Sequence, residues 1–332
     1  MRGAPQVAAV AVVCGALALA GPAAARIRTV EPGHSIQAAI DRSKPGDTVR
    51  VKHGGYAESL QITTERLKLR GENVTLTQPD APANNACGIC ISHARGVHVS
   101  GFRVRGFGGD GVFILGARRT VLRGNKLVHN GGYGSFADAS RGTRYVANIA
   151  RHNGDAGLYV GDSPKANTTI RNNVSAGNND AGILLRNAIG GRVRDNLLGG
   201  NCAGLVVLAD APGPAGRFKI ERNGVIANNR ACPADEEDGA PAISGIGIGL
   251  FGARGTTVRD NTVSRNRDGN PSFVSGGIVV TKGLEGAEPQ NDLVEGNRLA
   301  RNSPFDVDWD GSGTVRFNGN TCARSQPSGL CE

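Results

Sequence analysis

Two aspartates and an arginine stand at the ends of three short apolar segments that follow one another along the chain. Asp138 and Arg186 each lie four residues after the glycine that opens a segment, and Asp162 lies five residues after the glycine of the segment between them. Elimination at a uronate needs its carboxylate neutralised, by Ca²⁺ on carboxylates or by a cationic side chain, and a base that removes the neighbouring proton. Asp138, Asp162 and Arg186 are therefore candidate catalytic residues: the aspartates could hold Ca²⁺ while Arg186 binds the substrate carboxylate or takes the proton.

Two other interpretations of these three residues stay open. In a hydrolase, two carboxyl groups would act as acid and base, and their separation would decide between retention and inversion. In a protein with no reaction at this place, the three side chains would form a solvated row of charges with a surface ion pair. The sequence therefore predicts a charged row without choosing between elimination, hydrolysis and no reaction.

Aromatic residues recur two residues after the same glycines. The series of second residues reads Phe113, Phe136, Tyr159, Leu184 and Val206. Three aromatic side chains stacked outward on adjacent coils offer flat apolar area and could bind the faces of sugars, so Phe113, Phe136 and Tyr159 are candidate substrate-binding residues. Alternatively, a loop such as 209–217 or 231–243 folds over the row and makes it ordinary packing.

One repeat sets the framework for these residues: an asparagine, a second asparagine five residues later, and then Gly-apolar-x-apolar. The pairs are Asn125 and Asn130, Asn148 and Asn153, Asn173 and Asn178, Asn196 and Asn201, Asn223 and Asn228, Asn261 and Asn266, and Asn297 and Asn302. The first asparagine advances by 23, 25, 23, 27, 38 and 36 residues from pair to pair. A constant core register with insertions in the later repeats indicates loops on a solenoid.

The segments after the asparagine pairs alternate apolar residues with period two, which predicts β-strands. No helical period separates consecutive strands, so we expect tight turns and pairing of each strand with its copy one coil away, about 4.8 Å along the axis. The predicted fold is an all-β parallel β-helix, with the first and third residues after each glycine pointing inward and the second and fourth outward. The stacked asparagines are expected to be architectural.

Two histidines, His129 and His152, each stand directly before the second asparagine of a pair. They should stack on neighbouring coils and could share a metal or act as a base. Two ligands are too few for a defined metal site, so we interpret them as turn residues. Near the C-terminus, Val307 and Trp309 are expected to point inward and close the last coils, with Asp308 and Asp310 outward.

Both ends of the solenoid carry features that would cap it, since open ends expose unpaired strand edges. The segment 35–40 places Ile36, Ala39 and Ile40 on one helical face, which predicts a short helix over the first coil. At the other end, a loop closed by Cys322 and Cys331 is expected to follow the last strand, Thr314 to Phe317.

Residues 1–25 resemble a secretory signal peptide, with Arg2, an apolar run over 7–20 and three alanines at 23–25. We therefore expect a mature chain of one β-helix domain over 26–332. Six cysteines remain in it, and an even number fits an oxidising compartment. Sequence proximity suggests the disulfides Cys87–Cys90, Cys202–Cys232 and Cys322–Cys331, although six cysteines allow 15 connectivities. A redox motif at Cys87–Cys90 would need a thioredoxin-like context, which is not visible.

The composition suits small, tightly turned repeats, with 50 glycines and only 4% aromatic residues. The formal charge of +9 would attract acidic polymers. Alternatively, the arginine content reflects the base composition of the genome and not a binding partner. No apolar run after the signal is long enough to span a membrane. No basic run is interleaved with aromatic residues, so nucleic acid is not an expected partner.

The N-terminal runs Ser35-Ile-Gln-Ala-Ala-Ile-Asp41, Pro45-Gly-Asp-Thr-Val-Arg-Val51 and Gly55-Tyr-Ala-Glu58 resemble the opening of pectin-lyase-like right-handed β-helix proteins. The tail runs 309–313, 318–322 and 327–331 resemble the end of bacterial secreted right-handed β-helix repeat proteins. The resemblance covers nearly the whole mature chain and implies a single-stranded right-handed parallel β-helix with a short N-terminal capping helix. It leaves the activity open, because lyases, hydrolases, esterases, epimerases and proteins without an assigned reaction share this fold.

The signature motifs of polygalacturonases, of many pectate lyases and of alginate epimerases are missing from the sequence. We therefore predict a secreted, monomeric β-helix whose partner is an acidic polysaccharide, which it binds and either eliminates or hydrolyses. Ca²⁺ is the one cofactor that this chemistry suggests, and the sequence identifies no metal site. The alternative from another class is a non-catalytic envelope or glycan-binding scaffold.

Overall fold

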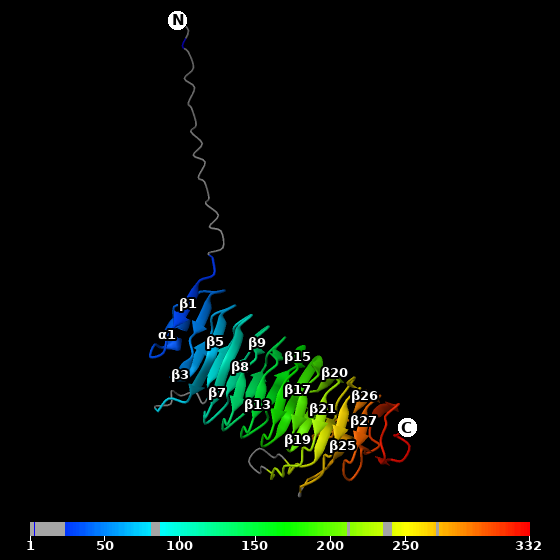
Figure 1. Cartoon of the computed structure of the whole chain (residues 1–332). Helices are drawn as coiled ribbons and strands as arrows, with labels where there is room; N and C mark the ends of the chain where they lie inside the picture. Colours follow the sequence, from blue (N-terminus) through cyan, green and yellow to red (C-terminus); the bar gives the residue numbers. More distant parts are fainter. Residues whose placement is uncertain (1–2, 4–23, 81–86, 211–212, 235–240, 270–271) are drawn as a thin grey trace.

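The computed structural model describes residues 3, 24–80, 87–210, 213–234, 241–269 and 272–332. Within them the chain forms thirty β-strands and one α-helix, wound into a rod of stacked coils. Figure 1 shows α1 at one end of the rod and the C-terminus at the other. The strands pair in parallel with their copies one coil away, as the repeat predicted.

Each full coil contributes to three faces, which we number in chain order from the strands that follow the second asparagines. Face 1 consists of β4 (Leu60–Ile62), β6 (Ile89–Ser92), β8 (Val112–Leu115), β11 (Ser135–Asp138), β14 (Leu158–Ser163), the first part of β17 (Ala181–Arg194), β19 (Ala203–Leu208), β22 (Ile246–Phe251), β25 (Gly276–Thr281), β28 (Val307–Trp309) and β30 (Ser325–Gln326).

Faces 2 and 3 complete each coil. Face 2 consists of β1 (Ile27–Val30), β2 (Thr48–Val51), the first parts of β5 (Lys68–Thr77) and β7 (His98–Arg105), β9 (Val121–Arg123), β12 (Arg144–Val146), β15 (Thr168–Arg171), the second part of β17, β20 (Gly216–Glu221), β23 (Thr257–Arg259), β26 (Gln290–Glu295) and β29 (Thr314–Asn318). Face 3 consists of β3 (Gly54–Ala57), the second parts of β5 and β7, β10 (Lys126–Val128), β13 (Ile149–Arg151), β16 (Val174–Ala176), β18 (Leu197–Gly199), β21 (Gly224–Ile226), β24 (Thr262–Ser264) and β27 (Arg298–Ala300).

The core fills the inside of the rod, and the predicted alternation of face 1 is confirmed. The first and third residues after each strand glycine are buried, as Val112 and Ile114 show in β8. Because the side chains of a strand alternate between its two sides, the second and fourth residues face outward. Burying one such aliphatic side chain stabilises the fold by about 1.5–3 kcal/mol, and each coil repeats the contribution.

The paired asparagines form two buried ladders, one at the corner between faces 2 and 3 and one between faces 3 and 1. Asn173 is typical of them. Its Oδ1 accepts from the side-chain amide of Asn148 at 3.0 Å, and its Nδ2 donates to Oδ1 of Asn196 at 2.9 Å. Its Nδ2 also donates to the carbonyl of Tyr145 at 3.1 Å. The prediction that these asparagines are architectural therefore agrees with their contacts.

Both ladders extend one step beyond the seven pairs. Asn320 continues the first ladder by accepting from Asn297 at 2.9 Å. The second ladder ends on Asp306, whose Oδ1 accepts from the backbone N–H of Asn302 at 3.1 Å and from its Nδ2 at 2.9 Å. Its other oxygen accepts from the N–H of Ala323 at 3.0 Å. Neither residue has an asparagine five positions away, so the spacing could not identify them.

The predicted N-terminal cap is confirmed as α1 (Ile36–Asp41), with Ile36, Ala39 and Ile40 buried. Ser35 caps the helix by accepting from the N–H of Ala38 at 3.1 Å. The carboxylate of Glu58 accepts from the N–H of Ile36 at 2.8 Å, which fixes the helix to the first coil.

At the C-terminus one detail of the prediction is wrong. The strand predicted over 314–317 is β29, but it is not the last, because β30 follows it and pairs with β28. β30 lies within the loop that the Cys322–Cys331 disulfide closes. Val307 is fully buried as expected, whereas Trp309 is only half-buried and packs 5.6 Å from Phe317 between ring centres.

The three disulfides predicted from proximity are all present: Cys87–Cys90, Cys202–Cys232 and Cys322–Cys331. Disulfides are typical of extracellular or periplasmic proteins, so they are consistent with such a location. Apart from residues 3, 24 and 25, the predicted signal peptide lies outside the described residues. In the part of the chain that the structure describes, no helix is long and apolar enough to cross a membrane.

Candidate functional site

The aromatic row on face 1 exists as predicted. Phe113, Phe136 and Tyr159 occupy equivalent positions on β8, β11 and β14. The ring centres of Phe113 and Phe136 lie 5.3 Å apart, and those of Phe136 and Tyr159 lie 4.3 Å apart with nearly parallel planes. Tyr133, in the turn before β11, joins the row with its ring centre 4.9 Å from that of Tyr159. Four aromatic rings thus form one cluster on the outside of the solenoid.

The row is only partly open to solvent. Phe113 and Phe136 are half-buried, whereas Tyr159 and Val206 are buried. Val206 belongs to a small second apolar cluster outside the main core, against which Ile243 packs. The alternative that a loop makes the row ordinary packing therefore applies to the later coils, where residues 232–234 and Ile243 lie beside face 1.

Asp138, Asp162 and Arg186 lie on successive coils at the same edge of face 1. Asp138 ends β11 and is in register with Gly161, which is in turn in register with Arg186. Partial burial and the nearby charge of Asp162 raise the pKa of Asp138. Asp162 accepts a hydrogen bond from Nδ2 of Asn187 at 3.1 Å. The structure therefore brings the three predicted residues into one charged row.

Arg186 has an acidic partner that the sequence did not reveal. Its guanidinium lies 2.5 Å from the carboxylate of Asp210 and also hydrogen-bonds the hydroxyl of Tyr159. Burial raises the pKa of that tyrosine to about 12. Asp210 was missed because it stands in the segment after β19, where the repeat is interrupted by an insertion.

A second acidic group, also missed, lies at the opposite edge of face 1 and consists of Asp110, Asp155 and Asp180. These residues stand in the turns that lead into β8, β14 and β17. Burial, with the charge of Asp155, raises the pKa of Asp110 and that of Asp180 to about 6 each. The available signal was an aspartate one or two residues before the strand glycine in three repeats.

A cleft of about 730 Å³ runs along face 1 between the two edges. Asp155, Asp180 and Tyr133 line it at the edge of the turns, and Arg186 and Asp210 line it at the other edge. Its apolar lining includes Leu184, Val206, Ile243, Ile246, Phe251 and Phe273. The cleft combines a cation, several carboxyl groups and an apolar floor, which is a usual composition for a binding site of a polar ligand.

Two of the predicted catalytic residues and all three predicted substrate-binding residues lie outside this cleft. Arg186 lines it, whereas Asp138 and Asp162 do not, and neither do Phe113, Phe136 and Tyr159. The charged row thus meets the cleft only at Arg186, its last member. The difference arises because insertions in the later coils build the cleft wall, and these insertions carry no repeat pattern.

The cleft wall is fastened to the solenoid by a disulfide. Cys232 belongs to the loop beside the cleft, and its partner Cys202 is fully buried in the turn before β19. Next to it, Pro233 and Ala234 also line the cleft. The acidic stretch 235–238, predicted to be a solvated loop, lies outside the described residues.

The histidines have the geometry of turn residues. The rings of His129 and His152 stack 5.1 Å apart, and both residues are exposed with positive φ. Asp308 is half-buried, and Asp310 accepts from Oγ1 of Thr281 at 2.5 Å. Within the described ranges, no three His, Cys, Asp or Glu side chains are grouped so that they could hold a metal ion.

The coils, the two asparagine ladders and the cleft on an outer face define the class of protein, a parallel β-helix with an exterior site. Residues 69–223 match the family model described as right handed beta helix region, and the fold of the chain is a right-handed parallel β-helix. The predicted resemblance to pectin-lyase-like proteins is thereby confirmed at the level of the fold.

Solved structures share the fold at low sequence identity. The A-module of the mannuronan C-5 epimerase AlgE4 from Azotobacter vinelandii is 17% identical, with 88% of this chain and 91% of that one covered and a TM-score of 0.62. The alginate lyase of a Paenibacillus species is 12% identical over 90% and 97%, with a TM-score of 0.52. Tailspike protein 2 of bacteriophage CBA120 is 14% identical over 85% and 44%, with a TM-score of 0.60. No curated protein matches the chain.

Proposed function

We propose that the protein is secreted and that it binds and cleaves an acidic polysaccharide in the cleft on face 1. The observation that carries this proposal is that Arg186 and Asp180 line one cleft from opposite edges. A guanidinium is suited to bind the carboxylate of a uronate, and a carboxyl group with a raised pKa is suited to give up a proton. Three disulfides and the polysaccharide-acting enzymes among the structural neighbours support the proposal.

The arrangement favours hydrolysis by a pair of carboxyl groups. Asp180, with a pKa of about 6, is partly protonated near neutral pH and would protonate the glycosidic oxygen as the bond to it breaks. Asp155, whose charge helps to raise that pKa, would be the ionised partner that activates water or attacks the sugar. Tyr133, between this pair and the aromatic row, would position the sugar ring.

Arg186 would select acidic sugars. Asp210 and Tyr159 hold its guanidinium at the cleft edge, so less conformational freedom is lost when a substrate carboxylate binds. Phe113 and Phe136 continue from Tyr159 away from the cleft, and they would bind the faces of further sugars along the chain. Asp138 and Asp162 would border the same subsites. We propose that they could bind Ca²⁺ together with carboxylates of the polymer.

The proposal is tested by incubating the mature protein with pectate, alginate, glycosaminoglycans and neutral glucans, with and without Ca²⁺. New reducing ends without unsaturated-uronate absorbance are expected on an acidic polymer, and Asp180→Asn should abolish them. Unsaturated uronate would show elimination instead, which would overturn the assignment of Asp180 and Asp155 as a hydrolytic pair. Phe251→Leu, a conservative change in the apolar cleft lining, is the control for folding and general cleft shape.

The structure also favours a second candidate, a glycan-binding scaffold without a reaction. Arg186 is already engaged by Asp210, and the aromatic row offers a binding platform that needs no catalysis. In that case the acidic polymer binds, no product appears, and Asp180→Asn leaves the affinity within about twofold. Product formation by the unaltered protein excludes this candidate.

A further inference from the structure

Six exposed arginines gather at the corner between faces 1 and 2, on the coils nearer the N-terminus. This arginine corner consists of Arg66, Arg95, Arg118, Arg119, Arg141 and Arg144. Arg95, Arg118 and Arg141 pair backbone to backbone on successive coils. Because coils repeat about every 4.8 Å, these three residues repeat the same positive charge at a regular interval along the rod axis.

In the described part of the chain, the arginine corner has almost no acidic partners. Among the described residues, no carboxylate forms an ion pair with any of its arginines except Glu65, which lies 3.9 Å from Arg66 with both side chains exposed. Such a contact contributes little in water. The pKa of His98, which borders the corner, is lowered by partial burial and by the charges of Lys68 and Arg144. The positive charge of the corner therefore disfavours the protonated form of the neighbouring His98.

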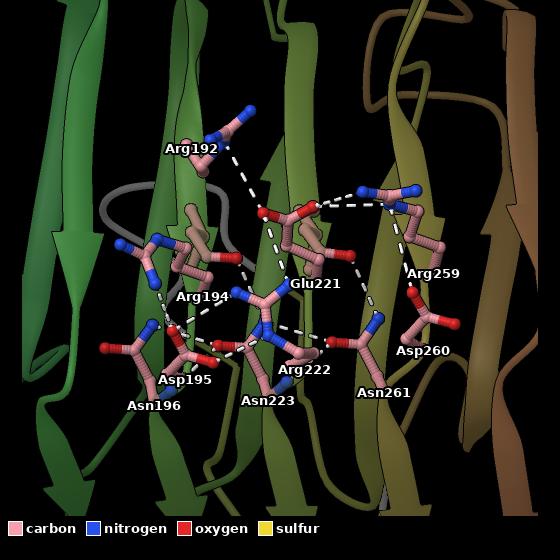
Figure 2. A network of polar contacts seen from close by, with 12 residues as sticks. Arg192, Arg194, Asp195, Asn196, Glu221, Arg222, Asn223, Arg259, Asp260 and Asn261 are labelled. Atoms are coloured by element: carbon pink, nitrogen blue, oxygen red, sulfur yellow. Dashed lines mark hydrogen bonds and ion pairs between the residues drawn. The ribbon is translucent and has the colours of Figure 1, made fainter.

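The later coils of face 2 show the opposite arrangement, which Figure 2 presents from close by. There the carboxylate of Glu221 contacts Arg259 at 2.9 Å and Arg192 at 3.5 Å. Asp195 contacts Arg222 at 2.9 Å. Acidic side chains thus neutralise arginines on the later coils, whereas the arginine corner on the earlier coils has only the contact of Glu65 with Arg66. Repeated like charges without a partner oppose folding, so the unpaired arginines call for an explanation other than stability.

The arginine corner is hollowed as well as charged. Two hollows of about 700 and 510 Å³ adjoin there and share Arg95, Arg119 and Gly142 in their lining. Gly96 and Gly142 have positive φ, so glycine suits these turns, and the absence of their side chains leaves the floor open between the arginines. No Phe, Tyr or Trp lines either hollow.

We propose that the arginine corner binds a linear acidic polysaccharide at a site separate from the cleft. An extended polyuronate carries a carboxylate on every sugar, and each guanidinium can bind a carboxylate through two parallel hydrogen bonds. Single-stranded nucleic acid is disfavoured, because its bases would find no aromatic side chain on which to stack. The corner would hold a long polymer along the rod whether or not the cleft cleaves it, so this inference does not rest on the proposed reaction.

The test measures binding of long-chain polygalacturonate to the mature protein at several salt concentrations. The variant Arg95→Ser/Arg119→Ser/Arg141→Ser should lower the affinity at least about tenfold and flatten its dependence on salt. The matched control removes three exposed arginines of face 3. It is Arg103→Ser/Arg105→Ser/Arg151→Ser. The control should change the affinity by no more than about twofold, and thermal melting verifies that both variants fold.

Two further measurements separate this proposal from that for the cleft. A short oligogalacturonate that binds the cleft should keep its affinity in the corner variant, whereas an Asp180→Asn/Arg186→Ala variant should keep most of its affinity for the long polymer. Equal losses in the corner and control variants would overturn the proposal, because they would indicate attraction by net charge alone. It would also be overturned if duplex or single-stranded DNA bound as tightly as polygalacturonate and lost affinity in the same three-arginine variant.

Discussion

The carboxylate of Asp210 lies 2.5 Å from the guanidinium of Arg186. Arg186 belongs to β17, whereas Asp210 stands in the inserted segment after β19, so the ion pair joins the solenoid to one of its insertions. Only 12% of the Asp210 side chain is exposed, whereas 44% of the Arg186 side chain is, so the arginine is held by a partly buried carboxylate and still faces solvent. The pair therefore fixes a cation at the edge of the cleft.

Removing either partner of this pair should impair action on acidic substrates to different extents. Arg186→Ala is expected to lower kcat/KM for an acidic polymer about 100-fold, because the substrate carboxylate loses its cation. Asp210→Asn should lower it about tenfold, because Arg186 remains but is no longer held. The double variant should be no worse than Arg186→Ala alone, since Asp210 acts through the arginine. Losses that simply add would contradict this view.

The activity should fall as the pH rises through the pKa of Asp180. This residue has a pKa of about 6 because of burial and the charge of Asp155, and the proposed reaction needs its protonated form. The kcat/KM profile should therefore lose activity above about pH 6, by roughly tenfold per pH unit well above that value. Asp180→Asn should lower the rate at least about 100-fold and abolish this limb. A wild-type rate that stays level from pH 5 to 8 would be incompatible with the role of Asp180.

Interrupting an asparagine ladder should destabilise the rod without touching the cleft. Asn173→Ala removes the acceptor of Asn148 and the donor to Asn196, and the polar groups left behind are buried. We expect a loss of about 3 kcal/mol in the free energy of unfolding, measured by denaturant titration. Asn172→Gly is the matched control, because Asn172 is exposed with a φ of 58° that glycine adopts freely. Equal losses in both variants would refute a special role of the ladder.

A buried aspartate in the core should make stability depend on pH. Asp292 is fully buried, its Oδ2 has no hydrogen-bond partner among the described residues, and burial raises its pKa from 3.8 to about 7. The folded state thus holds a proton that the unfolded state releases above about pH 4, so the contribution of this group to stability falls as the pH rises to about 7.

Replacing this residue tests the sign of that effect. Asp292→Asn cannot ionise, so it should raise the free energy of unfolding by about 1–3 kcal/mol at pH 8 and by much less at pH 4. The difference between variant and wild type is the quantity to follow, because Asp47 and Glu221, whose pKa values are lowered, shift stability in the opposite direction. A difference that is the same at both pH values would show that Asp292 does not titrate in this range.

The fold was predictable because residues at short, repeated spacings in the sequence determine it. The step of five positions between paired asparagines placed two corners of seven coils, and period-two alternation placed the inward side chains, as Asn173 and Val112 show. The capping helix and the disulfides followed from patterns within a few tens of residues. The ladder ends at Asn320 and Asp306 could not be found in this way, because each interrupts the spacing that identified the other members.

The cleft was less predictable because it depends on contacts between segments without a common pattern. Arg186 was found because it occupies an outward position on a strand, but its partner Asp210 lies in an insertion of irregular length. Asp155 and Asp180 stand in turns. An aspartate in a turn is most often a local hydrogen-bond acceptor, so its presence there does not by itself indicate a functional site. Only the coiling of the chain shows that these turns and that insertion face each other.

The end of the second asparagine ladder gives the rod a direction. Each asparagine in it donates to the side chain of the next member toward the C-terminus, and it also donates to a backbone carbonyl of the preceding coil. The second ladder ends on Asp306, which accepts with both carboxyl oxygens, whereas the first ends on Asn320, whose amide donates back to the carbonyl of Val294. Asp306 thus closes the row of side-chain donors, because its side chain has no N–H with which to continue the row into a further coil.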